Sequence, residues 1–193
     1  EKTDFPVTST TPKPLAFKPE KTDFPVTAMR VPKTDSHEEE GETGMGATTK
    51  EIPVSNDGIA TEQDLRNLQF VHPEQREILK VLAKKLQELR ETLGYNKFII
   101  VSGYRSPEYN SRIKGAAKNS YHTKRVAADI IVAPSTQVRV NFIRAASRLG
   151  FGGIGVYGSF IHVDLGKRRT WPTGIDLPQE IVQALRDHVN QTT

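Results

Sequence analysis

The apolar residues of this chain fall into two patterns, and the first of them predicts helices. From residue 73 to residue 93, apolar side chains recur every three to four positions and so share one face of a helix. Pro73 suits the first turn of that helix, and Gly94 suits its end. The same spacing predicts a helix at residues 136–149 and a closing helix at residues 177–189, and a shorter helix is expected from residue 107 to about residue 114.

The second pattern consists of short apolar runs typical of buried strands. Residues 97–102 and 127–131 form two such runs. Residues 152–157 and 160–164 form two more, and the Gly158-Ser159 turn between them predicts a hairpin. Because strands and helices do not alternate strictly, we expect an α+β domain: a small, mainly antiparallel sheet with helices packed on one face.

Two polar residues interrupt these apolar runs, and a histidine precedes one of the runs. Asp129 lies within AADII, and an aspartate in such a run needs a partner because a buried carboxylate is costly unless it is paired or bound to a metal. His162 lies in FIHVD, where strand alternation places it on the same face as Asp164. His122 precedes Asp129 by seven residues. Two histidines and a carboxylate match the ligand set of a catalytic zinc site, although a lone strand histidine is more often a packing residue.

The motifs around these residues resemble the M15 family of zinc D-Ala-D-Ala carboxypeptidases, and within it the murein endopeptidases with an S-x-H-x-x-G-x-A-x-D box and a later H-x-D. In chain order, the matching segments are SGYRSPEYN (102–110), NSYHTKRVAADI (119–130), GGIGVY (152–157), FIHVD (160–164) and a basic run ending at Trp171. Four linked motifs are more specific than either histidine alone.

The resemblance implies the fold of the hedgehog/DD-peptidase group, and a zinc ion (Zn2+) held by His122, Asp129 and His162. It also implies a substrate-binding Arg105 that holds a carboxyl or carbonyl group. Further substrate contacts are expected from Tyr104, Ser120 and Trp171. The activity implied is hydrolysis of peptide bonds in the stem or cross-links of peptidoglycan, at the bacterial cell wall or periplasm, by an enzyme that is exported or carried in a phage particle or lysis system.

Two positions depart from the family pattern. The glycine of the first box is Arg125 here, which implies either that the backbone needs no positive φ at this point or that the loop is remodelled. The family acid three residues before the second histidine is Ser159, whose hydroxyl has no useful basicity. We therefore expect Asp164 to be the catalytic base, with a competing role in which it only holds the ring of His162.

Composition divides the chain at about residue 58. Residues 1–58 hold seven of the twelve prolines and carry net charge −4, and their segment EKTDFPVT occurs at residues 1–8 and again at 20–27. We expect an extended or disordered tail, whose repeat is either a duplicated linker or a docking peptide for a protein partner. Residues 59–193 form the expected peptidase domain, and they carry net charge +8, which favours anionic partners.

Composition also limits the alternatives. The chain has no cysteine, so histidine and carboxylate are its only strong metal ligands, and it has no apolar run long enough for a membrane span. Two other functions stay open: a non-catalytic wall-binding or structural member of the same fold, and a basic nucleic-acid-binding protein with incidental histidines, of which nucleic-acid binding is the less expected.

Overall fold

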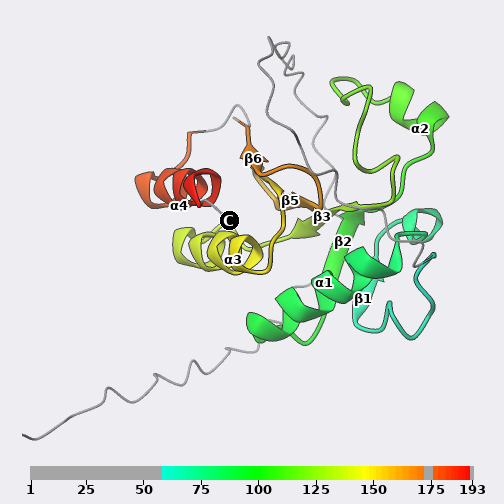
Figure 1. Ribbon diagram of the computed structural model, residues 1–193, viewed down its shortest axis with the longest axis horizontal. Helices are drawn as coiled ribbons and strands as arrows, with labels where there is room; N and C mark the ends of the chain where they lie inside the picture. The colour runs from blue at the N-terminus through cyan, green and yellow to red at the C-terminus, as the bar shows by residue number, and fades with distance from the viewer. Residues whose placement is uncertain (1–57, 172–175, 192–193) are drawn as a thin grey trace, which may run out of the picture. The chain divides into compact units, whose positions relative to one another are not determined.

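A computed structural model describes residues 58–171 and 176–191 (Figure 1). All but the last residue of the expected tail, including both copies of EKTDFPVT, lies outside these ranges, so its boundary and its role stay predictions. Among the described helices, none is long and apolar enough to cross a membrane.

A six-stranded mixed sheet forms the centre of the described part. The strands lie in the order β1-β2-β3-β5-β4-β6. The central pairs β2/β3, β3/β5 and β5/β4 are antiparallel, whereas the edge strands β1 and β6 add in parallel. The bounds are β1 Leu68–Phe70, β2 Phe98–Ser102, β3 Ala127–Ile131, β4 Gly153–Val156, β5 Phe160–Asp164 and β6 Arg169–Thr170. The mainly antiparallel sheet and the β4–β5 hairpin are confirmed. The two edge strands were not predicted, because two or three residues carry no periodic signal.

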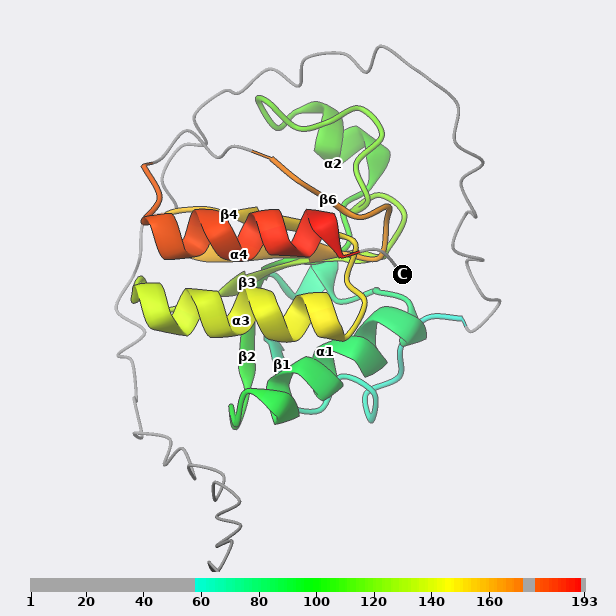
Figure 2. The ribbon, with the colours of Figure 1, turned by 60° about the vertical axis from the view of Figure 1, so that its left-hand side comes forward.

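Three of the helices lie on one side of this sheet, and α2 lies apart from them (Figure 2). Their apolar faces join the inner faces of the strands in one buried core, to which Leu86, Phe142 and Ile181 contribute from three different helices. The bounds are η1 Pro73–Gln75, α1 Lys80–Thr92, α2 Pro107–Ser111, α3 Thr136–Arg148 and α4 Gln179–Asn190. The predicted α+β class is confirmed.

The first helix is shorter than its apolar periodicity predicts. Pro73–Gln75 form only a single 3-10 turn, and α1 starts at Lys80. Leu79 is extended, because its N–H donates to the carbonyl of Arg125 over 3.0 Å and its backbone pairs with Ile59. Contacts with distant residues thus replace the helical hydrogen bonds at this point, which local periodicity does not reveal.

A buried polar cluster holds the last helix on the domain. His188 of α4 is fully buried, and its Nε2 lies 2.7 Å from the carbonyl oxygen of Gly152. Arg168 donates to the backbone carbonyl of His188 over 2.9 Å and to the hydroxyl of Ser147 over 3.0 Å. Burial is the largest influence on the pKa of His188 and lowers it, which favours the neutral ring. The helix therefore docks through specific hydrogen bonds as well as apolar contacts.

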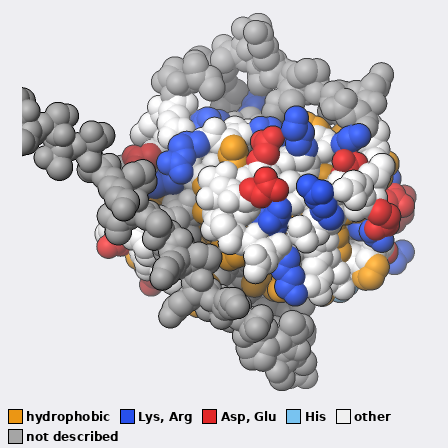
Figure 3. All heavy atoms as spheres, turned by 90° about the horizontal axis from the view of Figure 1, so that it is seen from below, with side chains coloured by type: hydrophobic (Ala, Val, Ile, Leu, Met, Phe, Trp, Pro, Cys, Tyr) orange, Lys and Arg blue, Asp and Glu red, His pale blue; other side chains and the backbone are white. Residues whose placement is uncertain are grey.

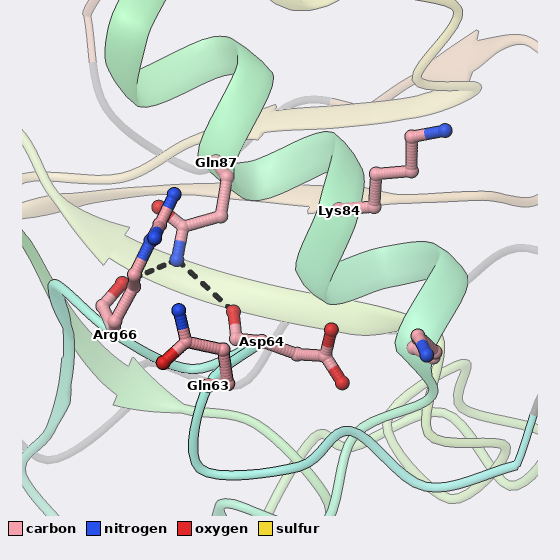
Figure 4. A pocket seen from close by; sticks show the side chains of 6 residues that line it. Gln63, Asp64, Arg66, Lys84 and Gln87 are labelled. Carbon is pink, nitrogen blue, oxygen red and sulfur yellow. Dashed lines mark hydrogen bonds between the residues drawn. The ribbon is translucent and has the colours of Figure 1, made fainter.

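A surface hollow lies along α1, away from the predicted metal ligands (Figure 4). Its wall comes from the loop before β1 and from the exposed side of α1, and Gln87 joins the two by donating to the carbonyl of Asp64 over 3.0 Å. The lining residues are Gln63, Asp64, Arg66, Lys80, Lys84 and Gln87. None of them comes from β3, from β5 or from the loop of His122, so this hollow is separate from the candidate site.

Charges of both signs are mixed on the face shown in Figure 3. Lys and Arg side chains stand there beside Asp and Glu side chains over the visible described residues. A nucleic-acid-binding surface usually gathers its basic residues into a patch or stripe. This face shows no such arrangement among those residues.

Candidate metal centre

The three predicted metal ligands meet at one point of the sheet. Asp129 and His162 lie at the middle of the neighbouring strands β3 and β5, directly opposite each other in the antiparallel register. His122 comes from the loop before β3, where a turn closed by the hydrogen bond from Arg125 N to His122 O leads the chain into the strand. All three side chains are buried. The sheet register and one tight turn therefore bring together residues that are up to 40 positions apart.

Three donor atoms form a compact triangle. His162 Nδ1 lies 2.8 Å from Asp129 Oδ1, and His122 Nε2 lies 3.3 Å from the same oxygen. The two nitrogen atoms are 3.2 Å apart. Zinc bonds of about 2.0–2.2 Å in tetrahedral directions place ligand atoms about 3.3–3.6 Å apart, so the triangle fits such an ion after small movements. Of the described residues, this is the group of histidine and carboxylate ligands that is able to hold a metal.

The opposite nitrogen of each histidine is already engaged. His122 Nδ1 lies 2.7 Å from the carbonyl oxygen of Gly103, which accepts only if this nitrogen carries the proton. His162 Nε2 lies 2.9 Å from Asp164 Oδ2, which requires a proton on that nitrogen in turn. The lone pairs of His122 Nε2 and His162 Nδ1 then face each other beside a carboxylate, an arrangement that needs a cation at its centre.

Burial and mutual contacts shift the pKa values of these three side chains. Burial lowers the pKa of His162, but its hydrogen bonds to Asp129 and Asp164 and their negative charges outweigh burial and raise the pKa to about 9. Burial also lowers the pKa of His122, and the charge of Asp129 offsets this only in part. For Asp129, burial raises the pKa, but the two histidines outweigh it and hold the pKa well below its usual range. Asp129 is therefore ionised near neutral pH, which is the form of a carboxylate that binds a metal.

Arg105 contacts the carboxylate ligand. Its Nη2 donates to Asp129 Oδ2 over 2.9 Å, and its Nε donates to Ser102 Oγ over 2.8 Å. The ion pair leaves Asp129 Oδ1 to face the two histidines. The expected contact of Arg105 with substrate stays a prediction, and the structure adds a hydrogen bond that orients Asp129.

Gln75 supports this arrangement from the turn before α1. Its side-chain oxygen accepts from Ser102 Oγ over 2.7 Å and from the N–H of Gly103 over 3.2 Å. One buried amide thus holds both the hydroxyl that binds Arg105 and the N–H of Gly103, whose carbonyl oxygen binds His122. The sequence contains no signal for this role, because Gln75 lies far from every motif along the chain.

Asp164 lies on the far side of His162 from the triangle, and it is fully buried. Besides His162, its carboxylate accepts from the N–H of Gly166 over 2.7 Å, from the N–H of Gly153 over 3.2 Å and from both Nη atoms of Arg169 over 3.1 and 2.8 Å. Burial raises the pKa of Asp164, but the hydrogen bonds and charges of His162 and Arg169 outweigh it and lower the pKa strongly. These contacts occupy both oxygens.

The other predicted substrate contacts surround the triangle in different ways. Ser120 Oγ accepts from the N–H of His122 over 3.3 Å, so it stabilises the turn of that ligand. Trp171 packs edge-on against the ring of His162, with 5.1 Å between ring centroids, and its Nε1 donates to Tyr157 Oη over 2.9 Å. Tyr104 lies under the guanidinium of Arg125 at 3.6 Å. Their contact with substrate stays a prediction.

The glycines of β4 make room for these side chains. A Cβ on Gly153 would lie 2.2 Å from Asp164 Oδ2, and a Cβ on Gly155 would lie 2.5 Å from the indole of Trp171. Gly155 is also the residue paired with His162 in the hairpin. The glycine run GGIG opposite FIHVD in a predicted hairpin is therefore a sequence signal for close approach at the site.

Arg125 occupies the position of the family glycine with a positive φ of 65°. Of the two alternatives drawn from the sequence, the one in which the backbone needs no positive φ at this point is therefore excluded. The side chain compensates through contacts, because Nη1 donates to the carbonyl and to the carboxylate of Glu77, each over 2.8 Å, and the guanidinium lies on the ring of Tyr104.

This geometry predicts different effects for two substitutions at Arg125. Both Arg125→Ala and Arg125→Gly remove the side-chain contacts, but only glycine relieves the left-handed backbone, which costs other residues about 1–2 kcal/mol. We expect Arg125→Gly to unfold at a temperature a few degrees above that of Arg125→Ala, with metal binding retained and activity retained or raised. Thermal unfolding of the two variants, each with a zinc titration, measures this. Loss of metal binding in Arg125→Gly would instead show that the side chain is a structural part of the site.

Comparison with known proteins agrees with the motifs. The model of the family described as Peptidase M15 matches residues 50–164. A protein named "Probable peptidoglycan L,D-endopeptidase MepK" from Haemophilus influenzae is 37% identical over 98 residues, which cover 47% of this chain and 52% of that protein. The "Peptidoglycan L,D-endopeptidase MepK" of Escherichia coli K12 is 36% identical over 97 residues, with the same coverage. The chain thus spans about half the length of the curated relatives it matches.

The matched region includes every residue of the donor triangle and ends at Asp164. The family match extends over more than half of the chain and agrees with the resemblance drawn from four motifs. This chain belongs to the peptidase M15 family.

Proposed function

We propose that this chain is a zinc-dependent peptidase that cleaves peptide bonds in the stem or cross-links of bacterial peptidoglycan. The observation that carries the proposal is the triangle of His122 Nε2, Asp129 Oδ1 and His162 Nδ1, which offers three ligand atoms of the types and spacing that zinc accepts. The family and the names of the relatives support the peptide substrate.

The chain's own residues have distinct tasks in this proposal. His122, Asp129 and His162 hold the ion, which when bound polarises a carbonyl and acidifies a water molecule. Gly103 and Asp164 hold the far nitrogens of the two rings, so that each ring presents its lone pair in a fixed direction. Arg105 orients Asp129, and its positive charge is placed beside the site, where it favours a carboxyl or carbonyl group of the substrate.

Asp164 takes the positioning role in this scheme. A base must reach the reacting water within hydrogen-bond distance, whereas both oxygens of Asp164 bind His162, Arg169 and backbone N–H groups on the other side of the ring. The carboxylate that accepts the proton is then a different one.

The names of the relatives favour endopeptidase activity over carboxypeptidase activity. They also favour action at the cell wall or in the periplasm, where peptidoglycan lies. Within the endopeptidases, those names point to a bond of the L,D type.

Digestion of purified peptidoglycan tests the proposal. We expect the zinc-loaded chain to convert cross-linked fragments to smaller ones, as seen by mass spectrometry, and we expect a chelator to stop the reaction and added zinc to restore it. Release of single terminal residues without loss of cross-links would indicate a carboxypeptidase. Metal binding with no change in any fragment would favour the non-catalytic member, and absence of metal binding would reject the proposal.

A further inference from the structure

The two arginines of the basic run Lys167-Arg168-Arg169 bind different partners. Arg168 donates to Ser147 and to the carbonyl of His188, so it holds α4. Arg169 instead forms a two-bonded ion pair with Asp164, over 3.1 and 2.8 Å. One arginine thus serves the fold, and its neighbour contacts the partner of a candidate metal ligand.

Asp164 depends on Arg169 for its charge balance. The carboxylate is fully buried, and a buried charge is tolerated only if it is paired and hydrogen-bonded. Among the described cationic groups that bind it, Arg169 alone is permanently charged, since the other is the ring of His162. The planar guanidinium also fixes the plane of the carboxylate, because both of its Nη atoms bind to it.

The plane of Asp164 in turn sets the ring of His162. Asp164 Oδ2 accepts from Arg169 Nη2 over 2.8 Å and from His162 Nε2 over 2.9 Å. Rotation of the carboxylate would therefore break the hydrogen bond to Arg169 or the one to His162. Outer partners of this kind orient a ligating histidine and raise its affinity for metal.

Arg169 also lies between the aromatic side chains beside the two histidines. Its guanidinium carbon is 4.7 Å from the ring centroid of Tyr121 and 5.2 Å from that of Trp171. Tyr121 directly precedes His122, and Trp171 packs on His162. Cation–π contacts of this length are attractive, so one side chain joins the surroundings of both histidines.

We propose that Arg169 is a positioning residue of the metal centre, which holds Asp164, and through it the ring of His162, and joins Tyr121 to Trp171. This inference rests on the proposed function, because it assigns the arginine a task at the zinc site. It goes beyond that function by assigning the task to a side chain that is not one of the three candidate metal ligands.

The experiment compares neighbouring arginines in the full chain. Arg169→Met, Arg169→Lys and Arg168→Met are titrated with zinc against a competing chelator, and each is loaded with Co²⁺ to record its visible absorption. Trp171 is the single tryptophan of the chain, so its fluorescence reports on the site without any activity assay. Thermal unfolding of the metal-free proteins measures the fold separately.

We expect Arg169→Met to bind zinc about 10- to 100-fold more weakly, with a changed Co²⁺ spectrum and a changed Trp171 emission. Arg169→Lys should lie between it and the wild type, because an ammonium group keeps the charge but not the two-bonded geometry. Arg168→Met should lower the unfolding temperature and leave zinc affinity within about twofold.

Two results would overturn the inference, and they are distinguishable from failure of the proposed function. Wild-type affinity and spectra in Arg169→Met, or in Arg169→Lys if the methionine variant does not fold, would show that Arg169 positions nothing. Equal losses of zinc affinity in the Arg168 and Arg169 variants would show a general effect on the fold. Failure of the wild type itself to bind zinc would remove the proposed function and this inference with it.

Discussion

Alanine in place of His122, Asp129 or His162 is expected to abolish stoichiometric zinc binding and peptidoglycan cleavage. Each residue supplies one atom of a three-atom donor set, and two remaining ligands hold zinc poorly because water is a weak replacement for imidazole or carboxylate. The loss of affinity should exceed the roughly 10- to 100-fold typical of losing an outer partner. Metal analysis after dialysis, together with the peptidoglycan assay, measures both effects.

Two other histidines provide matched controls. His188 is buried like the ligands but binds Gly152 at the docking site of α4, so His188→Gln should lower the unfolding temperature and keep the metal. The ring of His72 is half-exposed and lies 3.7 Å from the carboxylate of Glu74, so His72→Ala should change neither the unfolding temperature nor metal binding. Stoichiometric zinc in all three ligand variants, or its loss in His188→Gln alone, would contradict the assignment of the site.

Asp164→Asn is expected to weaken zinc binding by about 10- to 100-fold and to lower turnover by a similar factor at limiting zinc. The carboxylate accepts five hydrogen bonds from four residues, and it donates none. An asparagine of the same size has a single acceptor oxygen, and its NH₂ group would face N–H donors of Arg169 or of the backbone. The ring of His162 then loses its fixed orientation.

Zinc affinity and turnover at saturating zinc distinguish the two roles considered for Asp164. A positioning role predicts that saturating zinc restores most of the activity. A catalytic base predicts normal zinc affinity with a loss of at least about a thousandfold in turnover, which added metal does not repair. Asp187→Asn is the control, because this aspartate lies on α4 and accepts from the exposed side chain of Gln183, and it should behave as the wild type.

Local sequence determined the elements that carry the site. The apolar runs of β2, β3, β4 and β5 and the periodicity of α3 depend on neighbours in the chain, so their positions were predicted to within a few residues. The family and the candidate ligands followed from four motifs in a fixed order. The family pattern also bears on the conformation at Arg125, because a glycine at that position is compatible with the positive φ that the structure shows there.

Tertiary structure alone decided how the ligands are supported. Gln75 lies 47 positions before His122, and it reaches the site only because η1 packs beside the end of β2. Helix α1 begins at Lys80 rather than near the predicted residue 73, because Leu79 pairs with Ile59 and Arg125. The sequence does not distinguish the adjacent Arg168 and Arg169. In the fold they bind different partners, because Arg168 reaches the carbonyl of His188 on α4 whereas Arg169 reaches Asp164. Periodicity and motifs report the preferences of nearby residues, whereas a buried polar side chain takes the partner that the packed fold brings within hydrogen-bond distance.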